Sequence, residues 1–226
     1  MKILSIGQTL SYEGLDIDSV DMHTLPDVQE IGQYDYMVIH GGDGSIRRLL
    51  NHFQGVQKLP VAVLNPTGSF NVVAKLHRVP KVERVLEGLA EGRRPRTHKH
   101  HLFRANEEIF LFSAGNMGDL QHIFLSETLR FGWLKHGMAK YLLALICLLP
   151  AYLVTTPFML ASPARFFIFT PLRAIKKFGS FYGEVQEIEI DLDNDHNLIE
   201  LDGDLVFIEG RHLSIRKAGY VDVAIQ

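Results

Sequence analysis

Apolar and polar positions in the first 95 residues alternate between strand-like and helix-like patterns. Short runs rich in β-branched residues, each bounded by turn residues, are typical of strands covered on both faces. Apolar residues at helical spacing follow most of these runs. We expect strands at 2–6, 19–25, 36–40 and 60–64, and helices at 27–33, 46–53, 72–79 and 82–89. Alternation of this kind predicts a parallel sheet with covering helices.

The pattern changes after the charged and turn residues at 91–96, where we place a domain boundary. Beyond it most short runs read as paired strands, and one helical stretch covers about 121–149. The predicted strands are 98–105, 108–113, 165–169, 184–192, 198–202, 204–208, 212–216 and 221–225. The predicted fold class is therefore an α/β N-terminal domain with a parallel sheet, residues 1–94. A mainly antiparallel β domain carrying a helical insertion follows, residues 95–226.

An apolar stretch from Tyr141 to Ala164 contains no charged residue, yet three prolines interrupt it. Proline removes a backbone donor, which lipid cannot replace, so we do not expect a membrane-spanning helix. We expect a buried helix at 138–149 followed by an apolar loop, with Cys147 as a small core residue. Contact with anionic lipid is the alternative, because cations flank the stretch. They are Lys135, Lys140, Arg165, Arg173, Lys176 and Lys177.

Composition narrows the function classes. Of the 226 residues, 46% are hydrophobic and 22% charged, which is too apolar for a disordered chain. The net charge of −3 offers no global basic field, so nucleic acid is not the expected partner. A single cysteine excludes an internal disulfide, and the first strand turns polar too soon for a signal peptide, which favours a cytoplasmic protein. We expect His98, His100 and His101 to be exposed strand positions rather than metal ligands.

A glycine loop follows the predicted strand 36–40 and precedes a helix. It reads Gly41-Gly42-Asp43-Gly44-Ser45. Glycines let the backbone approach a ligand closely, and N–H groups at a helix start attract anions such as phosphates. Asp43 could reach a magnesium ion beside such phosphates, directly or through water, and Ser45 could donate a hydrogen bond. The alternative is a tight turn held by an Asx-type hydrogen bond.

A second loop, Asn65 to Asn71, follows the predicted strand 60–64 and also precedes a helix. Ligands of open parallel sheets bind outside the carboxyl ends of the strands, so the two loops could face one another. Gly68, Ser69 and Asn71 would then join the first loop in one site. Ser69 and Asn71 could equally be ordinary helix caps.

These motifs carry a family resemblance. The segment His40–Ser45 looks like the GGDGT loop shared by diacylglycerol kinases, sphingosine kinases and NAD kinases. Pro66–Asn71 is similar to the P-x-G-T-x-N-D motif of the diacylglycerol and sphingosine branch, and Leu201–Asp204 resembles its L-D-G-E motif. Phe110–Gly118 looks like the strand and glycine turn that open the second domain of that branch. The chain thus resembles the diacylglycerol kinase and sphingosine kinase-like lipid kinases, as a shortened, divergent member.

The resemblance implies ATP-dependent, magnesium-dependent phosphoryl transfer to the hydroxyl of a diacylglycerol-like lipid. Asp204 would take the hydroxyl proton, with Asp202 beside it, although Asp-Gly-Asp is also a hairpin-turn signal. Expected partners are a nucleotide, a lipid substrate and, transiently, the membrane surface, with a homodimer through an open sheet edge possible. The expected location is cytoplasmic and peripheral at the membrane. The nucleotide-binding residues implied are Gly41, Gly42, Asp43, Gly44, Ser45, Gly68, Ser69 and Asn71.

The chain also departs from the family pattern. No Asn-Pro loop follows the first strand, and Val72 replaces an aspartate of the second motif. Asp204 stands where the family has glutamate, and the P-x-A-x-x-x-D-G segment that carries a structural magnesium site is missing. These departures favour an alternative, a catalytically reduced relative that binds nucleotide or lipid without turnover. An NAD-kinase-like enzyme is a further alternative, which the loop at 66–71 disfavours.

Overall fold

The computed structural model divides the chain into two compact units. Unit 1 comprises Met1–Leu102 with Gly219–Gln226, and unit 2 comprises Phe103–Ala218. The C-terminal residues return to unit 1 because Val223 pairs with Ala62 in its sheet. The predicted roles of a nucleotide-binding domain at 1–94 and a lipid-substrate domain at 95–226 stay predictions. The structure describes residues 1–25, 28–68, 70–116, 142–144, 146–150, 153–154, 164–171 and 187–226.

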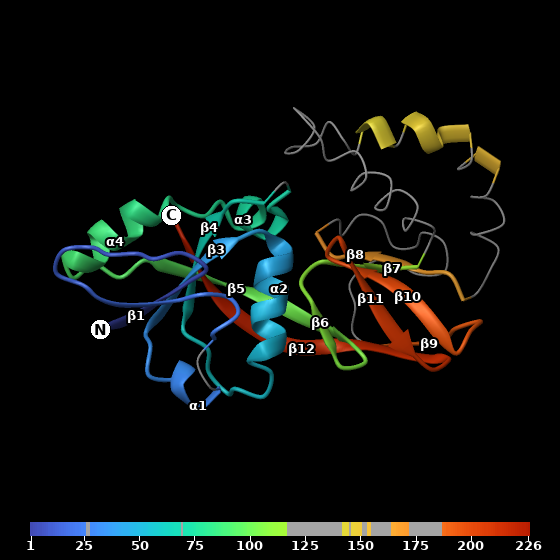
Figure 1. Cartoon of the computed structure of the whole chain (residues 1–226), viewed down its shortest axis with the longest axis horizontal. Helices are drawn as coiled ribbons and strands as arrows, with labels where there is room; N and C mark the ends of the chain where they lie inside the picture. The colour runs from blue at the N-terminus through green and yellow to red at the C-terminus, as the bar shows by residue number, and fades with distance from the viewer. Residues whose placement is uncertain are drawn as a thin grey trace. The chain divides into compact units, whose positions relative to one another are not determined.

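Unit 1 is built on a parallel sheet in the order β2-β1-β3-β4-β12 (Figure 1). The strands β1 and β3 pair from Ile3 with Tyr36 to Ile6 with Ile39, and β3 pairs with β4 up to Gly41 with Pro66. The carboxyl ends of β3 and β4 therefore lie at one edge of the sheet. The strands are β1 (Lys2–Ile6), β2 (Asp16–Val20), β3 (Tyr36–Gly41), β4 (Val61–Pro66) and β12 (His212–Ile225).

Burial explains why these short runs form strands. Residues 36–40 of β3 are all buried, so both faces of this strand are covered, as the continuous apolar run predicted. One face packs against α4, where Val82, Val85, Leu86 and Leu89 join Val38 in a single core cluster. The helices are α1 (Val28–Ile31), α2 (Asp43–His52), α3 (Val72–His77) and α4 (Val82–Ala90).

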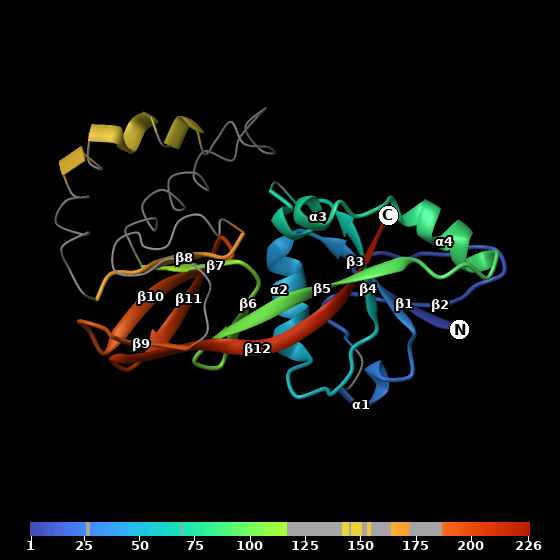
Figure 2. The same cartoon turned by 180° about the vertical axis from the view of Figure 1, so that it is seen from behind.

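Unit 2 contains an antiparallel sheet in the order β11-β10-β7-β8. In addition β9 pairs antiparallel with β12, and β5 pairs antiparallel with β6. Figure 2 shows the long strands β5 and β12, which are neighbours in the larger sheet. The predicted fold class, a parallel α/β sheet followed by antiparallel β structure, is confirmed. The remaining strands are β5 (Arg96–Ala105), β6 (Glu108–Phe110), β7 (Ser113–Gly115), β8 (Phe167–Phe169), β9 (Glu187–Asp191), β10 (His196–Leu201) and β11 (Asp204–Glu209).

Four predicted strands differ clearly from the strands of the structure. The strand predicted at 19–25 is β2, which ends at Val20 and exposes its aspartates while Ile17 packs against the core of unit 1. The run 108–113 is two strands, because the N–H groups of Leu111 and Phe112 bond to a carboxylate instead of a neighbouring strand. The two strands predicted at 212–225 are one, and it accommodates Gly219 at φ 119°. The predicted helix at 121–149 falls mostly outside the described residues.

The described residues between 142 and 154 are helical, and most of them are exposed, although Ala144 is buried, which corrects the prediction of a buried core helix for this part. Cys147 is exposed, and so are Leu142 and Ile146, each with 60% of its surface accessible. Among the described residues, no helix is long and apolar enough to cross a membrane.

Candidate active site

The first glycine loop ends β3 and starts α2. Gly42 occupies the N-cap position in an extended conformation, and its carbonyl accepts the N–H groups of Ser45 and Ile46 at 3.0 and 3.2 Å. Asp43 and Gly44 lie in the first turn, where N–H groups have no partner within the helix. The ten-residue helix adds its positive end to these groups, so the loop suits an anion such as a phosphate.

The second glycine loop lies directly against the first, as the sequence predicted. The Thr67 N–H donates to the Gly41 carbonyl at 3.1 Å. A Cβ atom added to Gly68 would lie 2.7 Å from the Gly42 Cα atom, and one added to Gly42 would lie 3.1 Å from the Gly68 Cα atom. Glycine is therefore required at Gly68, and any larger residue at Gly42 would be tight, because backbone packs on backbone where the loops meet.

Asp43 holds the two loops together. Its Oδ2 atom accepts the Val72 N–H at 2.7 Å and its Oδ1 atom accepts the Val73 N–H at 3.1 Å, so this side chain caps α3. Burial raises the pKa of the Asp43 carboxyl, while these two N–H groups and Lys75 lower it. Each oxygen atom accepts one backbone N–H and keeps a further lone pair, so the predicted contact of Asp43 with a phosphate-bound magnesium ion, directly or through water, stays a prediction. Over the described parts of the chain, no group of three or more His, Cys, Asp or Glu side chains could hold a metal ion.

Asn71 closes the second loop on itself. Its backbone is left-handed, with φ at 49°, and its side chain makes no hydrogen bond to the helix that it precedes. Instead the Oδ1 atom accepts the Gly68 N–H at 3.0 Å, and the Nδ2 group donates to the Gly68 carbonyl at 2.6 Å. The alternative of Asn71 as an ordinary side-chain cap is therefore wrong, because Asp43 supplies that cap. Ser69 lies outside the described residues.

Removing the Asp43 carboxylate tests how much its hydrogen bonds to the start of α3 stabilise the fold. We expect Asp43→Ala to lower the free energy of unfolding by about 2–4 kcal/mol, because two N–H groups at the start of α3 lose a charged acceptor. Asp21→Ala is the matched control, since Asp21 is exposed and its carboxylate accepts the N–H of His23, two positions away. Urea unfolding of both variants measures the difference. Equal stability of the two would show that these hydrogen bonds do not contribute.

A chain of hydrogen bonds links the carboxyl ends of β1, β3 and β4. The Asn65 amide donates to His40 Nδ1 at 2.8 Å, which leaves the His40 Nε2–H to donate to Ser5 Oγ at 3.1 Å. Ser5 Oγ in turn donates to the Gln8 carbonyl at 2.7 Å. Burial lowers the pKa of His40, in keeping with a neutral ring. Sequence reasoning missed this chain, although polar residues at the ends of two buried strands were a signal for it.

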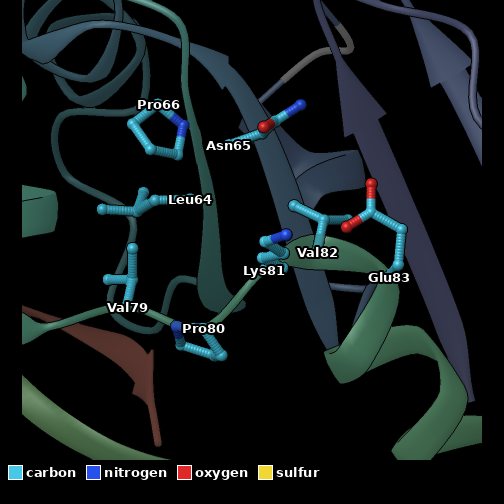
Figure 3. A pocket seen from close by; sticks show the side chains of 8 residues that line it. All are labelled: Leu64, Asn65, Pro66, Val79, Pro80, Lys81, Val82 and Glu83. Atoms are coloured by element: carbon cyan, nitrogen blue, oxygen red, sulfur yellow. The ribbon is translucent and has the colours of Figure 1, made fainter.

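A pocket of about 450 Å³ opens at the carboxyl end of β4. Residues 64–66 and 79–83 line it. Figure 3 shows their side chains, with Lys81 and Glu83 at the start of α4. The pocket adjoins the second glycine loop through Pro66, at the edge where open parallel sheets bind their ligands.

Three histidines form a hydrogen-bonded cluster beside α3. His77 Nε2 lies 2.9 Å from His100 Nδ1, and His77 Nδ1 lies 3.2 Å from His98 Nδ1. The expectation that His100 is an exposed strand position was wrong, because it is 5% exposed. Each of the two contacts holds one proton, and the two remaining ring nitrogen atoms can hold one each. Four protons are one more than three neutral histidines carry, so the cluster has at most one positive charge while both contacts persist. Three separate histidines would bind a proton each in acid.

The cluster predicts a loss of stability in acid. Burial, and then the neighbouring His98, lower the pKa of His77. Below the ordinary histidine pKa of about 6.5 the unfolded chain therefore binds protons that the folded chain refuses, and stability falls with falling pH. We expect His77→Gln to flatten this dependence, measured by urea unfolding between pH 7.5 and 5.5. An unchanged pH dependence in the variant would contradict the prediction.

The Asp202-Gly203 segment of unit 2 is a hairpin turn. Both residues have positive φ, 54° and 89°, and they join β10 to β11 with Leu201 opposite Asp204. The Asp202 carboxylate accepts the N–H groups of Leu111, Phe112 and Ser113 at 2.6, 2.9 and 3.0 Å. The hairpin reading is thus confirmed, and the contacts of Asp202 are those of a residue that positions a backbone.

Two further residues complete this turn. Glu200 is buried, and its carboxylate accepts the Ser113 hydroxyl at 3.0 Å and the Gly203 N–H. Asp204 starts β11 and is partly exposed. The hydrogen bonds of Asp202 and Glu200 therefore hold the turn that precedes Asp204. Sequence reasoning missed Glu200, because no motif indicated it.

The fold and its loops define a class: an α/β sheet with two touching glycine loops at the carboxyl ends of its strands, followed by an antiparallel sheet. Residues 14–101 match the family model for the diacylglycerol kinase catalytic domain. The match includes both glycine loops, and it confirms the predicted resemblance to the diacylglycerol kinase-like lipid kinases. No curated protein is similar enough in sequence to count as a match.

One solved structure agrees with this fold. A protein from Bacillus anthracis str. Sterne, described as a candidate diacylglycerol kinase, has a TM-score of 0.55 at 11% identity, covering 100% of this chain and 96% of its own. An NAD kinase from Archaeoglobus fulgidus in complex with ATP has a TM-score of 0.43 at 11% identity, covering 99% and 93%. Only the first is close enough to establish a shared fold.

Proposed function

We propose that this protein is an ATP-dependent lipid kinase that phosphorylates the hydroxyl of a diacylglycerol-like lipid. The contact between the two glycine loops carries the proposal. It joins the N-terminus of α2 to the second loop at the carboxyl ends of β3 and β4, inside the segment that matches the family. The phosphates of the nucleotide would lie against Gly41 to Ser45 on one side of the site. Gly68, Ser69 and Asn71 would form its other side.

Asp204 is the proposed base. The lipid hydroxyl oxygen attacks the γ-phosphorus, the bond to the β–γ bridging oxygen breaks, and ADP leaves. The hydroxyl proton passes to the Asp204 carboxylate. Asp202 and Glu200 hold the turn in place through their hydrogen bonds to residues 111–113 and 203. Magnesium would arrive on the nucleotide phosphates and would neutralise part of their charge.

A binding protein without turnover is the second candidate. The engagement of both Asp43 oxygen atoms with α3, and an aspartate in place of the family glutamate at 204, favour it. An assay of phosphatidate and ADP formation from ATP and diacylglycerol in mixed micelles separates the two. Equal amounts of both products support the kinase. ATP binding without either product would support the binding protein.

A further inference from the structure

The helical residues 142–144, 146–150 and 153–154, the yellow segments of Figure 1, expose large apolar side chains. The exposed fractions are 60% for Leu142 and Ile146, 49% for Leu149 and 71% for Leu153. These four residues are spaced by three or four positions, as on one face of a helix. Soluble proteins rarely leave such a surface in water, so it marks a site of interaction.

Charge around this segment points to one kind of partner. From Thr128 to Gly183 the sequence contains no aspartate or glutamate, although the whole chain has 26 acidic residues and a net charge of −3. The same stretch holds the only tryptophan, Trp133, a residue enriched at membrane interfaces. Its seven basic residues are Arg130, Lys135, Lys140, Arg165, Arg173, Lys176 and Lys177.

We infer that the exposed helical residues between 142 and 154 bind the surface of an anionic membrane, with the side chains of Leu142, Ile146, Leu149 and Leu153 among the acyl chains. An exposed apolar helix that basic residues flank in the sequence can bind anionic lipid through both the apolar side chains and the positive charges. Pro150, Pro157 and Pro163 favour a segment that lies on the bilayer over one that crosses it. The inference deepens the proposed function and rests on it, since a diacylglycerol-like substrate is presented at such a surface.

A second copy of the chain fits this apolar face less well than an anionic membrane does. Two copies that met through this face would bring two acid-free basic stretches together, and like charges across an interface oppose association. Anionic headgroups supply the missing negative charge instead.

Cys147 makes the inference directly testable. It is the only cysteine, it is exposed, and it lies inside the segment, so one polarity-sensitive fluorophore can be attached there. We expect a blue shift when vesicles containing phosphatidylglycerol are added, and none with phosphatidylcholine alone. The matched control carries the fluorophore at Leu198, in a Cys147→Ser/Leu198→Cys variant. Leu198 is also exposed, at 48%, but lies in β10, and there we expect no shift.

Substitution of the apolar face provides a second measurement. We expect Ile146→Glu/Leu153→Glu to weaken vesicle binding at least about tenfold, because two side chains no longer leave water for the acyl chains. No shift at Cys147, an equal shift at Leu198, or undiminished binding by the double variant would each overturn the inference. A shift that depends on protein concentration without vesicles would overturn it in favour of self-association.

The same preparations separate this inference from the proposed function. Phosphorylation of diacylglycerol in detergent micelles, without a fluorescence shift on vesicles, would support the proposed kinase activity and refute the membrane-binding segment. A fluorescence shift on anionic vesicles, without ATP binding, would support the membrane-binding segment and refute the proposed kinase activity.

Discussion

Replacing Gly68 with alanine is expected to lower the free energy of unfolding by about 1–3 kcal/mol and to weaken ATP binding at least tenfold. The new Cβ atom would lie 2.7 Å from the Gly42 Cα atom and 2.9 Å from the Asn71 Oδ1 atom. The first neighbour is backbone and cannot turn away. The two loops must therefore separate, and the second side of the proposed phosphate site moves with them.

Gly32→Ala is the matched control for this substitution. A Cβ atom at Gly32 meets nothing within 4 Å, and this glycine does not have a positive φ. Urea unfolding and calorimetric ATP titration of both variants measure the two effects. If Gly68→Ala keeps wild-type stability and ATP affinity, the loop contact is neither tight nor part of the nucleotide site.

The second large effect is expected at Asp204. Asp204→Asn should reduce the rate of lipid phosphorylation by about 10²–10⁴-fold, because an amide cannot accept the hydroxyl proton. Its ATP affinity and stability should stay close to those of the wild type, since Asp204 is partly exposed at the start of β11.

Asp202→Asn should behave in the opposite way. This carboxylate accepts three backbone N–H groups and is 8% exposed, so an amide in its place should cost about 2–4 kcal/mol of stability. Kinetic assays paired with urea unfolding distinguish the two aspartates. A fall in turnover for Asp202→Asn alone, with Asp204→Asn fully active, would move the base to Asp202 and refute the assignment.

Much of the fold could be predicted because its signals are local. The apolar run of β3 and the glycines that follow it gave the strand, the turn and the start of α2 in order. The contact between the two loops also followed from sequence, because the ends of adjacent parallel strands share an edge.

The parts that sequence could not predict depend on contacts between distant residues. The cap that Asp43 gives to α3 joins residues 29 and 30 positions apart, and Asp202 reaches N–H groups 89 to 91 positions away. No local pattern distinguishes a carboxylate that braces a backbone from one that binds a metal or a proton. The histidine cluster was missed for the same reason, since His77 and His100 lie in different elements.

The apolar segment shows a different limit of sequence reasoning. Apolar residues at helical spacing look alike whether they face a core or a membrane. The prediction of a core helix for residues 138–149 was wrong for most of the described residues, because apolarity alone does not distinguish the two environments. The absence of acidic residues from 128 to 183 supports the membrane contact that we infer.

Calorimetric titration of the wild-type protein with ATP and magnesium, with adenosine as the ligand that lacks phosphates, decides whether the glycine loops form a nucleotide site. We expect saturable binding of ATP and at least tenfold weaker binding of adenosine, because the proposed site holds the phosphates. No binding of ATP at millimolar concentration by the folded protein, or equal affinity for adenosine, would contradict a phosphate site at residues 41–45 and 68–71.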